Sequence, residues 1–246
     1  MMNRYNADIL VQKYGGSSLA DPQRIKAVAT RIGHSYDKGN KTIVVVSAMG
    51  DTTNELIKIA QTVNDTPNDR EMDLLLSTGE VVSCTLVTMA LHSLGYPAIG
   101  LTGGQAGIHT DLYHSRAKIL DIDTDRILKE LTEGKIVIVA GFQGTTPDMD
   151  VTTLGRGASD TTAVALAASL KANMCEIYTD VEGIYTADPR IVPDARKLEE
   201  IGYEEMLELA ASGAKMNPRS IELGALYNVP IRVTSSFSDS PGTLIH

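Results

Sequence analysis

The chain has 246 residues, 43% of them hydrophobic and 22% charged, which suits one buried core or two lobes that share a sheet. Aromatic residues make up only 4%, Trp is absent and the net charge is −9. These values argue against nucleic-acid binding and against anionic membranes, but not against small anionic ligands, which respond to local charge.

The hydrophobic pattern alternates between short apolar runs and helical spacing. The apolar runs predict strands at 9–14, 42–47, 98–101, 135–140, 174–179 and 230–234. Helices are expected at 22–32, after 54, at 73–94 with an interruption near 77–80, at 123–131, after 160 and at 204–211. Since several strands are apolar throughout, the pattern predicts an α/β fold with a mostly parallel sheet covered on both faces.

Five of these strands end in loops rich in Gly, Ser or Thr. The loops follow Lys13, Ser47, Leu101, Ala140 and Thr179. In an open α/β sheet, ligands bind at the carboxyl ends of the strands. We therefore expect a long polar groove at one edge of the sheet.

The segment from Leu154 to Ala163 is the most informative stretch of this groove. It places two glycines, Arg156, Ser159 and Asp160 directly before an alanine-rich helix. This is the layout of an anion-binding turn at a helix N-terminus, where Arg156 could hold a carboxylate and Asp160 could orient cations. The alternative is an ordinary loop in which Ser159 or Asp160 caps the helix.

Two lysines are candidates for neutralising charge. Lys13 precedes Gly15, Gly16 and Ser17, a turn whose N–H groups could hold phosphate oxygens, although the pattern is not a Walker loop. Lys215 is the second candidate, and Asp160 could hold both ammonium groups in place. Phosphoryl transfer needs such charge neutralisation more than covalent chemistry.

The segment 179–190 follows a buried strand and offers hydroxyls, carboxylates, Tyr185 and Arg190. It could receive a nucleotide, with Tyr185 along the base or ribose and Arg190 at phosphate. A β-turn with a surface Asp-Pro break explains the same residues, and the segment alone slightly favours that alternative.

Ser47, Thr53 and Glu80 could hold a small polar ligand. Glu80 lies in an otherwise apolar stretch, where an unpaired carboxylate is costly, so we expect a partner such as an ammonium group. With Arg156 opposite, the site would suit an amino acid.

The cysteines and histidines predict no metal site. Cys84 and Cys175 lie in apolar surroundings, which favours buried structural thiols, and the five histidines lack ligand spacing. No uninterrupted apolar run is long enough to span a bilayer, and residues 1–8 lack the apolar core of a secretory signal. We expect a cytoplasmic protein.

Five motifs together resemble the catalytic domain of aspartate kinases, within the amino-acid-kinase family. They lie at 11–18, 76–80, 101–108, 154–163 and 178–190, and the similarity extends to 241–245. Acetylglutamate, carbamate and uridylate kinases fit these motifs less well. The resemblance implies a three-layer αβα sandwich with an open, mainly parallel eight-stranded sheet. It also implies transfer of the ATP γ-phosphoryl group to the β-carboxylate of L-aspartate, the first step toward lysine, threonine and methionine.

The resemblance also implies roles for single residues. Lys13, Asp160 and Lys215 would be catalytic; Ser47, Thr53, Glu80, Arg156 and Ser159 would bind aspartate; Gly15, Gly16, Ser17, Thr179, Asp180, Tyr185, Arg190 and Lys215 would bind the nucleotide. Mg²⁺ would be held mainly by the nucleotide phosphates. Within one domain, residues 1–134 would form the amino-acid lobe and residues 135–246 the nucleotide lobe, and the protein could be a homo-oligomer.

The chain departs from the family pattern at several points. Ala158 and Gly104 replace a usual Gly and a common bulky aromatic, and the segment after Lys215 is one residue short. The chain also stops where aspartate kinases continue into paired ACT domains, so it is expected to be a catalytic domain or a short paralogue. The departures leave two alternatives open: a related kinase with another carboxylate acceptor, or a non-catalytic protein that binds an amino acid or nucleotide.

Overall fold

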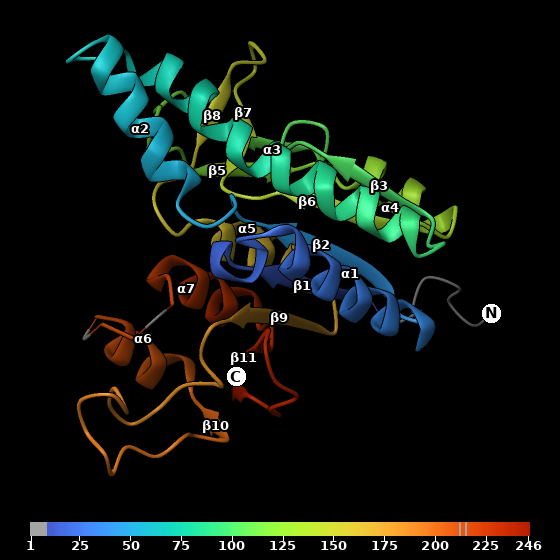
Figure 1. The fold of residues 1–246 in the computed structure, drawn as a ribbon, viewed down its shortest axis with the longest axis vertical. Helices are drawn as coiled ribbons and strands as arrows, with labels where there is room; N and C mark the ends of the chain where they lie inside the picture. Colours follow the sequence, from blue (N-terminus) through green and yellow to red (C-terminus); the bar gives the residue numbers. More distant parts are fainter. Residues whose placement is uncertain (1–8, 212, 215) are drawn as a thin grey trace.

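A computed structural model describes residues 9–211, 213–214 and 216–246, and an eight-stranded sheet forms its middle layer (Figure 1). The strand order is β10-β12-β11-β9-β1-β2-β6-β3, and every neighbouring pair is parallel except β11 and β12. The strands are β1 (Ile9–Tyr14), β2 (Lys41–Val46), β3 (Ala98–Leu101), β6 (Ile136–Ala140), β9 (Met174–Thr179), β10 (Glu200–Ile201), β11 (Ile231–Ser235) and β12 (Thr243–Ile245). The predicted mainly parallel eight-stranded sheet is thus confirmed.

Helices cover both faces of this sheet and complete the three layers. The helices are α1 (Pro22–Asp37), α2 (Thr52–Val63), α3 (Asp69–Ser93), α4 (Asp125–Thr132), α5 (Ser159–Ser169), α6 (Tyr203–Ala211) and α7 (Pro218–Tyr227), with a 3-10 helix at Gly16–Leu19. Alternate side chains of β2 face opposite ways: Val44 and Val46 pack against α1 and α3, whereas Ile43 and Val45 lie in the core formed with α4 to α7. This alternation explains why the strand is apolar throughout.

A second, four-stranded sheet was not predicted. Its strands are β4 (Ile108–Thr110), β5 (Ile119–Ile122), β7 (Gln143–Thr145) and β8 (Val151–Thr153). They are only three or four residues long and rich in polar residues, so they give no clear hydrophobic period. Asp73 of α3 fixes this sheet, because its buried carboxylate accepts hydrogen bonds from Ser115 N at 2.9 Å and from Thr153 Oγ1.

The expected interruption of the helix near 77–80 is wrong, because α3 runs unbroken from Asp69 to Ser93. Gly79 has a packing role there: a Cβ atom at this position would lie 2.9 Å from Ala48 Cβ, so glycine lets the helix approach the loop after β2. By length and composition α3 is also apolar enough to cross a membrane. It packs against α1, β3 and β6, and it buries the carboxylates of Asp73 and Glu80.

The carboxyl ends of the central strands meet at one edge of the sheet, as predicted. Lys13 pairs in register with Val45 of β2 and Ile177 of β9. Backbone hydrogen bonds continue past the strand ends, from Gly15 N to Tyr178 O and from Gly141 N to Val46 O. The first and second halves of the chain contribute strands to this one sheet, and their division into two lobes at about residue 134 stays a prediction.

Candidate active site

An ion pair joins the first strand to the helix that follows the glycine turn. Lys13 Nζ lies 2.7 Å from Asp160 Oδ1, and the two side chains are only 12% and 11% exposed. Lys13 is the penultimate residue of β1, and Asp160 lies in the first turn of α5. The ammonium group is therefore held at the N-terminus of α5. Lys215, the other predicted cation, lies outside the described residues.

The turn after β1 lies tightly against the loop after β2. A Cβ atom on Gly16 would approach Ala48 O to 2.7 Å, so only glycine fits, and Gly50 N donates to Gly16 O. A Cβ atom added to Gly15 would lie 3.6 Å from Lys13 Nζ, so this side of the turn faces the ammonium group. The structure thus brings the predicted phosphate turn next to the predicted ammonium group.

Glu80 of α3 is buried beside the same loop. Its side chain is 4% exposed, and Oε1 accepts a hydrogen bond from Ala48 N at 3.1 Å. Burial raises the pKa of Glu80 to about 7, although the Ala48 N–H and the charge of Lys13 act in the opposite direction. Oε2 has no hydrogen-bond partner among the described residues, so this carboxylate can still accept a hydrogen bond from a cationic donor.

Among the residues that the structure describes, no side chain caps the turn before α5. The capping residue is Ala158, so the alternative in which Ser159 or Asp160 caps the helix is wrong. Gly155 and Gly157 take φ values of +94° and +73°, which glycine adopts at little cost. Because no side chain occupies the cap, the first N–H groups of α5 are left for another acceptor, and an anion suits them.

The glycine-to-alanine departure at Ala158 carries no backbone strain. Its φ is −79°, inside the region open to every L-residue. The side chain is 1% exposed and packs with Ala117, Phe142 and Leu154 in a small apolar cluster. The alanine is therefore accommodated in the turn without a left-handed backbone conformation.

Arg156 is exposed and is held from two sides. Its Nη1 donates to Asn54 Oδ1 at 3.2 Å, and its carbonyl accepts from Asn217 Nδ2 at 3.3 Å. Neither asparagine was among the predicted site residues. Asn217 precedes Pro218 and caps α7, a helix-start pattern that the sequence contains and that could have revealed α7.

The other predicted aspartate contacts surround this turn. Ser47 follows β2, and its N–H donates to Tyr14 O; Thr53 lies in the first turn of α2, one residue before Asn54. Ser159 is buried, and a Cβ atom on Gly141 would lie 2.9 Å from its Oγ, so the strand end after β6 presses against α5.

Residues 179–190, the predicted nucleotide segment, make their contacts within the segment and with the chain after it. Thr179 ends β9; its hydroxyl donates to Asp180 Oδ1, and its carbonyl accepts from Ser236 N. The backbone of Tyr185 pairs with that of Lys197 in an isolated antiparallel β-bridge. Arg190 is exposed and pairs with Asp188 at 2.6 Å, so in this structure its guanidinium is turned to a local partner.

The sequence model of the amino acid kinase family matches residues 8–235. The chain belongs to the amino acid kinase family. It is 57% identical over 239 residues to an aspartokinase of Mycolicibacterium smegmatis, covering 96% of this chain and 57% of that protein. The chain therefore spans little more than half the length of that curated relative.

Two solved aspartate kinases have the same fold as this chain. The aspartate kinase from Synechocystis superposes with a TM-score of 0.87 at 49% identity, over 96% of this chain and 39% of that one. Aspartokinase III of E. coli, solved with aspartate and ADP, gives 0.88 at 28% identity, over 97% of this chain and 64% of that one. The predicted resemblance is thus confirmed at the level of sequence and fold.

Proposed function

We propose that this chain transfers the γ-phosphoryl group of ATP to the β-carboxylate of L-aspartate and forms 4-phospho-L-aspartate. The observation that carries the proposal is the nearly buried Lys13–Asp160 ion pair at the uncapped start of α5. It sets an oriented cation beside free helix N–H groups, the environment in which phosphoryl charge is best stabilised. The similarity to aspartokinases supports aspartate as the acceptor.

Aspartate would bind between α3 and the turn before α5. The unpartnered Glu80 Oε2 would accept a hydrogen bond from the substrate ammonium group, and Arg156 would hold the α-carboxylate with paired N–H donors. Ser47, Thr53 and Ser159 would complete the polar lining. In this structure the Arg156 guanidinium donates a hydrogen bond to the neutral Asn54 side chain. Binding of aspartate would replace this acceptor with the charged α-carboxylate.

ATP would lie on the side of β9. Gly15, Gly16 and Ser17 would hold phosphate oxygens, and the segment containing Thr179, Asp180, Tyr185 and Arg190 would contact the nucleoside and phosphates, together with Lys215. The nucleotide phosphates would be the main ligands of Mg²⁺. Bound Mg²⁺ would neutralise phosphate charge.

The reaction would be a direct in-line attack. The β-carboxylate is already ionised at neutral pH, so no general base is needed. The Lys13 ammonium would stabilise charge on the transferring phosphoryl group, and Asp160 would keep Lys13 aimed at it. We further propose that the protein works in the cytoplasm, in soluble form and as a homo-oligomer.

Production of an acyl phosphate tests the proposal. With ATP, Mg²⁺ and L-aspartate, added hydroxylamine should trap aspartyl hydroxamate, and omission of aspartate should abolish the signal. A folded protein that binds both substrates without forming hydroxamate would instead be the non-catalytic alternative.

A panel of other carboxylates tests the second candidate function, a different acceptor. Gly104 motivated it, but a Cβ atom there would lie only 2.6 Å from Thr145 Cγ2, so no aromatic ring fits in this packing. The glycine lets the loop after β3 pack against Thr145 of β7, and the panel decides between aspartate and another acceptor.

A further inference from the structure

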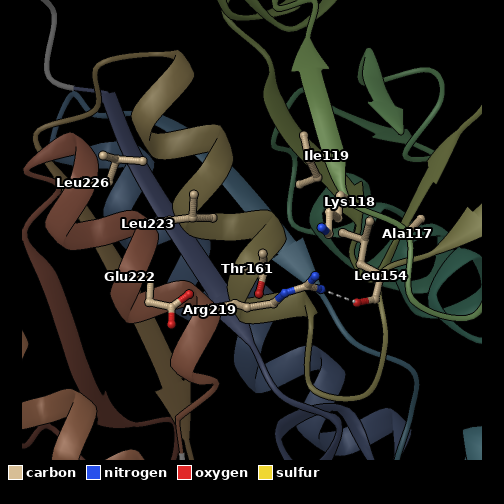
Figure 2. A pocket seen from close by; sticks show the side chains of 9 residues that line it. All are labelled: Ala117, Lys118, Ile119, Leu154, Thr161, Arg219, Glu222, Leu223 and Leu226. Atoms are coloured by element: carbon tan, nitrogen blue, oxygen red, sulfur yellow. Dashed lines mark hydrogen bonds between the residues drawn. The ribbon is translucent and has the colours of Figure 1, made fainter. Parts of the chain in front are cut away.

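A cavity of about 280 Å³ includes Leu154 and Thr161 of the 154–163 segment in its lining but none of the residues predicted to contact aspartate or ATP (Figure 2). It opens between α5, α7 and the segment before β5. Leu154, Ile119, Leu223 and Leu226 supply apolar walls, and Leu226 is 72% exposed at one end. The volume lies just below the range of roughly 300–1,000 Å³ for small-molecule sites, so only a small ligand would fit.

A buried hydroxyl without a partner lines the cavity. Thr161 is 6% exposed, and its Oγ1 has no hydrogen-bond partner among the described residues. A helical threonine can donate to the carbonyl four residues earlier, as Thr162 does to Ala158 O at 3.1 Å. This oxygen is covered by protein in the structure, and because an unpaired buried hydroxyl is costly, a ligand acceptor that reached it would be stabilised.

The charged side chains around the cavity are two cations and one anion. Arg219 Nη1 donates to Leu154 O at 3.3 Å, which holds the guanidinium across the cavity (Figure 2). Lys118, on the segment before β5, is exposed and lies on the same side as this guanidinium, whereas Glu222 is exposed and lies on α7, three residues after Arg219. The net charge of these three side chains is +1, which favours a ligand with a single negative charge.

We propose that this cavity binds a small monocarboxylate with an aliphatic body. The carboxylate would accept hydrogen bonds from Arg219, Lys118 and the Thr161 hydroxyl, and the hydrocarbon would cover Leu223 and Leu226. The site is separate from phosphoryl transfer and does not depend on the proposed acceptor. Its apolar walls exclude a purely ionic ligand such as acetate as the best fit.

Methyl NMR on the whole chain, with labelled Ile and Leu methyl groups, tests the site with hexanoate as the probe. Hexanoate should shift the methyl signals of Ile119, Leu154, Leu223 and Leu226 saturably, with a Kd on the order of 1 mM for so small a ligand. Hexan-1-ol, which lacks the charge, should bind roughly tenfold more weakly. Absence of saturable shifts at these four residues in the folded protein would overturn the site, and equal affinities would overturn the carboxylate.

Four variants, one of them a control, refine the test. Leu223→Trp should fill the cavity and abolish the shifts of the other three methyl residues; retained binding would contradict the site. Lys118→Gln should weaken hexanoate but not hexan-1-ol, whereas Lys129→Gln, an exposed lysine outside the cavity lining, should change neither. Thr161→Val keeps the shape, so it should weaken hexanoate while leaving Tm unchanged or higher; unaltered hexanoate affinity would remove Thr161 from the site.

Discussion

The two sides of the candidate site differ in how their charged groups are held. On the proposed aspartate side, Lys13, Asp160 and Glu80 are nearly buried and are positioned by packed strands and helices, and Arg156 is the exposed exception. On the proposed nucleotide side, Arg190 is exposed on a loop and pairs with Asp188, two residues away. Burial strengthens the first set electrostatically and limits its motion, whereas water screens the second. We therefore expect substitutions on the two sides to differ in size as well as in kind.

The largest effect should come from Lys13→Ala. It removes the cation placed for the transition state, so kcat should fall by on the order of 10³-fold while the KM for aspartate changes by less than about threefold. Steady-state kinetics by the hydroxamate assay measures both constants, and Lys38→Ala, at the exposed end of α1, is the matched control. A change confined to KM would assign Lys13 to substrate binding.

Glu80→Gln should act mainly on aspartate binding. Loss of the negative charge should raise the KM for aspartate roughly 10- to 100-fold, with a smaller change in kcat. In the unsubstituted protein, the pKa of about 7 means that Glu80 must lose a proton to pair with an ammonium group. The KM for aspartate should thus rise as pH falls below about 7, and this rise should be absent in Glu80→Gln. A pH-independent KM in the parent would contradict the role.

The same carboxylate should also affect stability. The pKa of Glu80 is higher in the folded protein, about 7, than the ordinary 4.5, so folding favours the protonated form. The stabilisation is fully present below pH 4.5 and is lost as pH rises through 7. Glu80→Gln should therefore exceed the parent in unfolding free energy by on the order of 2 kcal/mol at pH 8, with the gap closing toward pH 5. Urea unfolding at both pH values measures this, and an equal gap would refute the linkage.

The sequence singled out the buried charged residues of the candidate site but not the residues that hold Arg156. Lys13 stands at a strand end, Glu80 inside an apolar run and Asp160 between a glycine turn and an alanine-rich helix, where a charge is conspicuous. Asn54 and Asn217, which hold Arg156, are ordinary polar residues whose partners lie far away in the chain. No local pattern distinguishes such a residue from a surface asparagine.

The fold shows the same limit. The strands found from the sequence are apolar runs of four to six residues, whereas β10 has two residues and β12 three. Such short strands exist because their neighbours in the sheet supply the hydrogen bonds. The second sheet likewise depends on Asp73 of α3, so its polar strands become intelligible only after α3 is in place.

On the exposed side, Arg190→Ala should have a smaller effect. The guanidinium already has a local partner, and hydrogen bonds to Asp188 raise its pKa, so binding a phosphate would exchange one exposed contact for another. We expect the KM for ATP to rise about threefold to tenfold, with unchanged Tm. A loss as large as that of Lys13→Ala would mean that the loop closes over ATP and buries Arg190.

Ala158→Gly should give the smallest effect on activity and separates backbone strain from packing. The φ of −79° suits either residue, so restoring glycine relieves no strain, and kcat should stay within about twofold of the parent. Stability should fall by about 1 kcal/mol, because a buried methyl group is lost from the cluster with Phe142 and Leu154 and the unfolded chain gains freedom. Thermal unfolding and the hydroxamate assay measure the two quantities. A marked gain in kcat would show that the methyl group hinders the turn during catalysis.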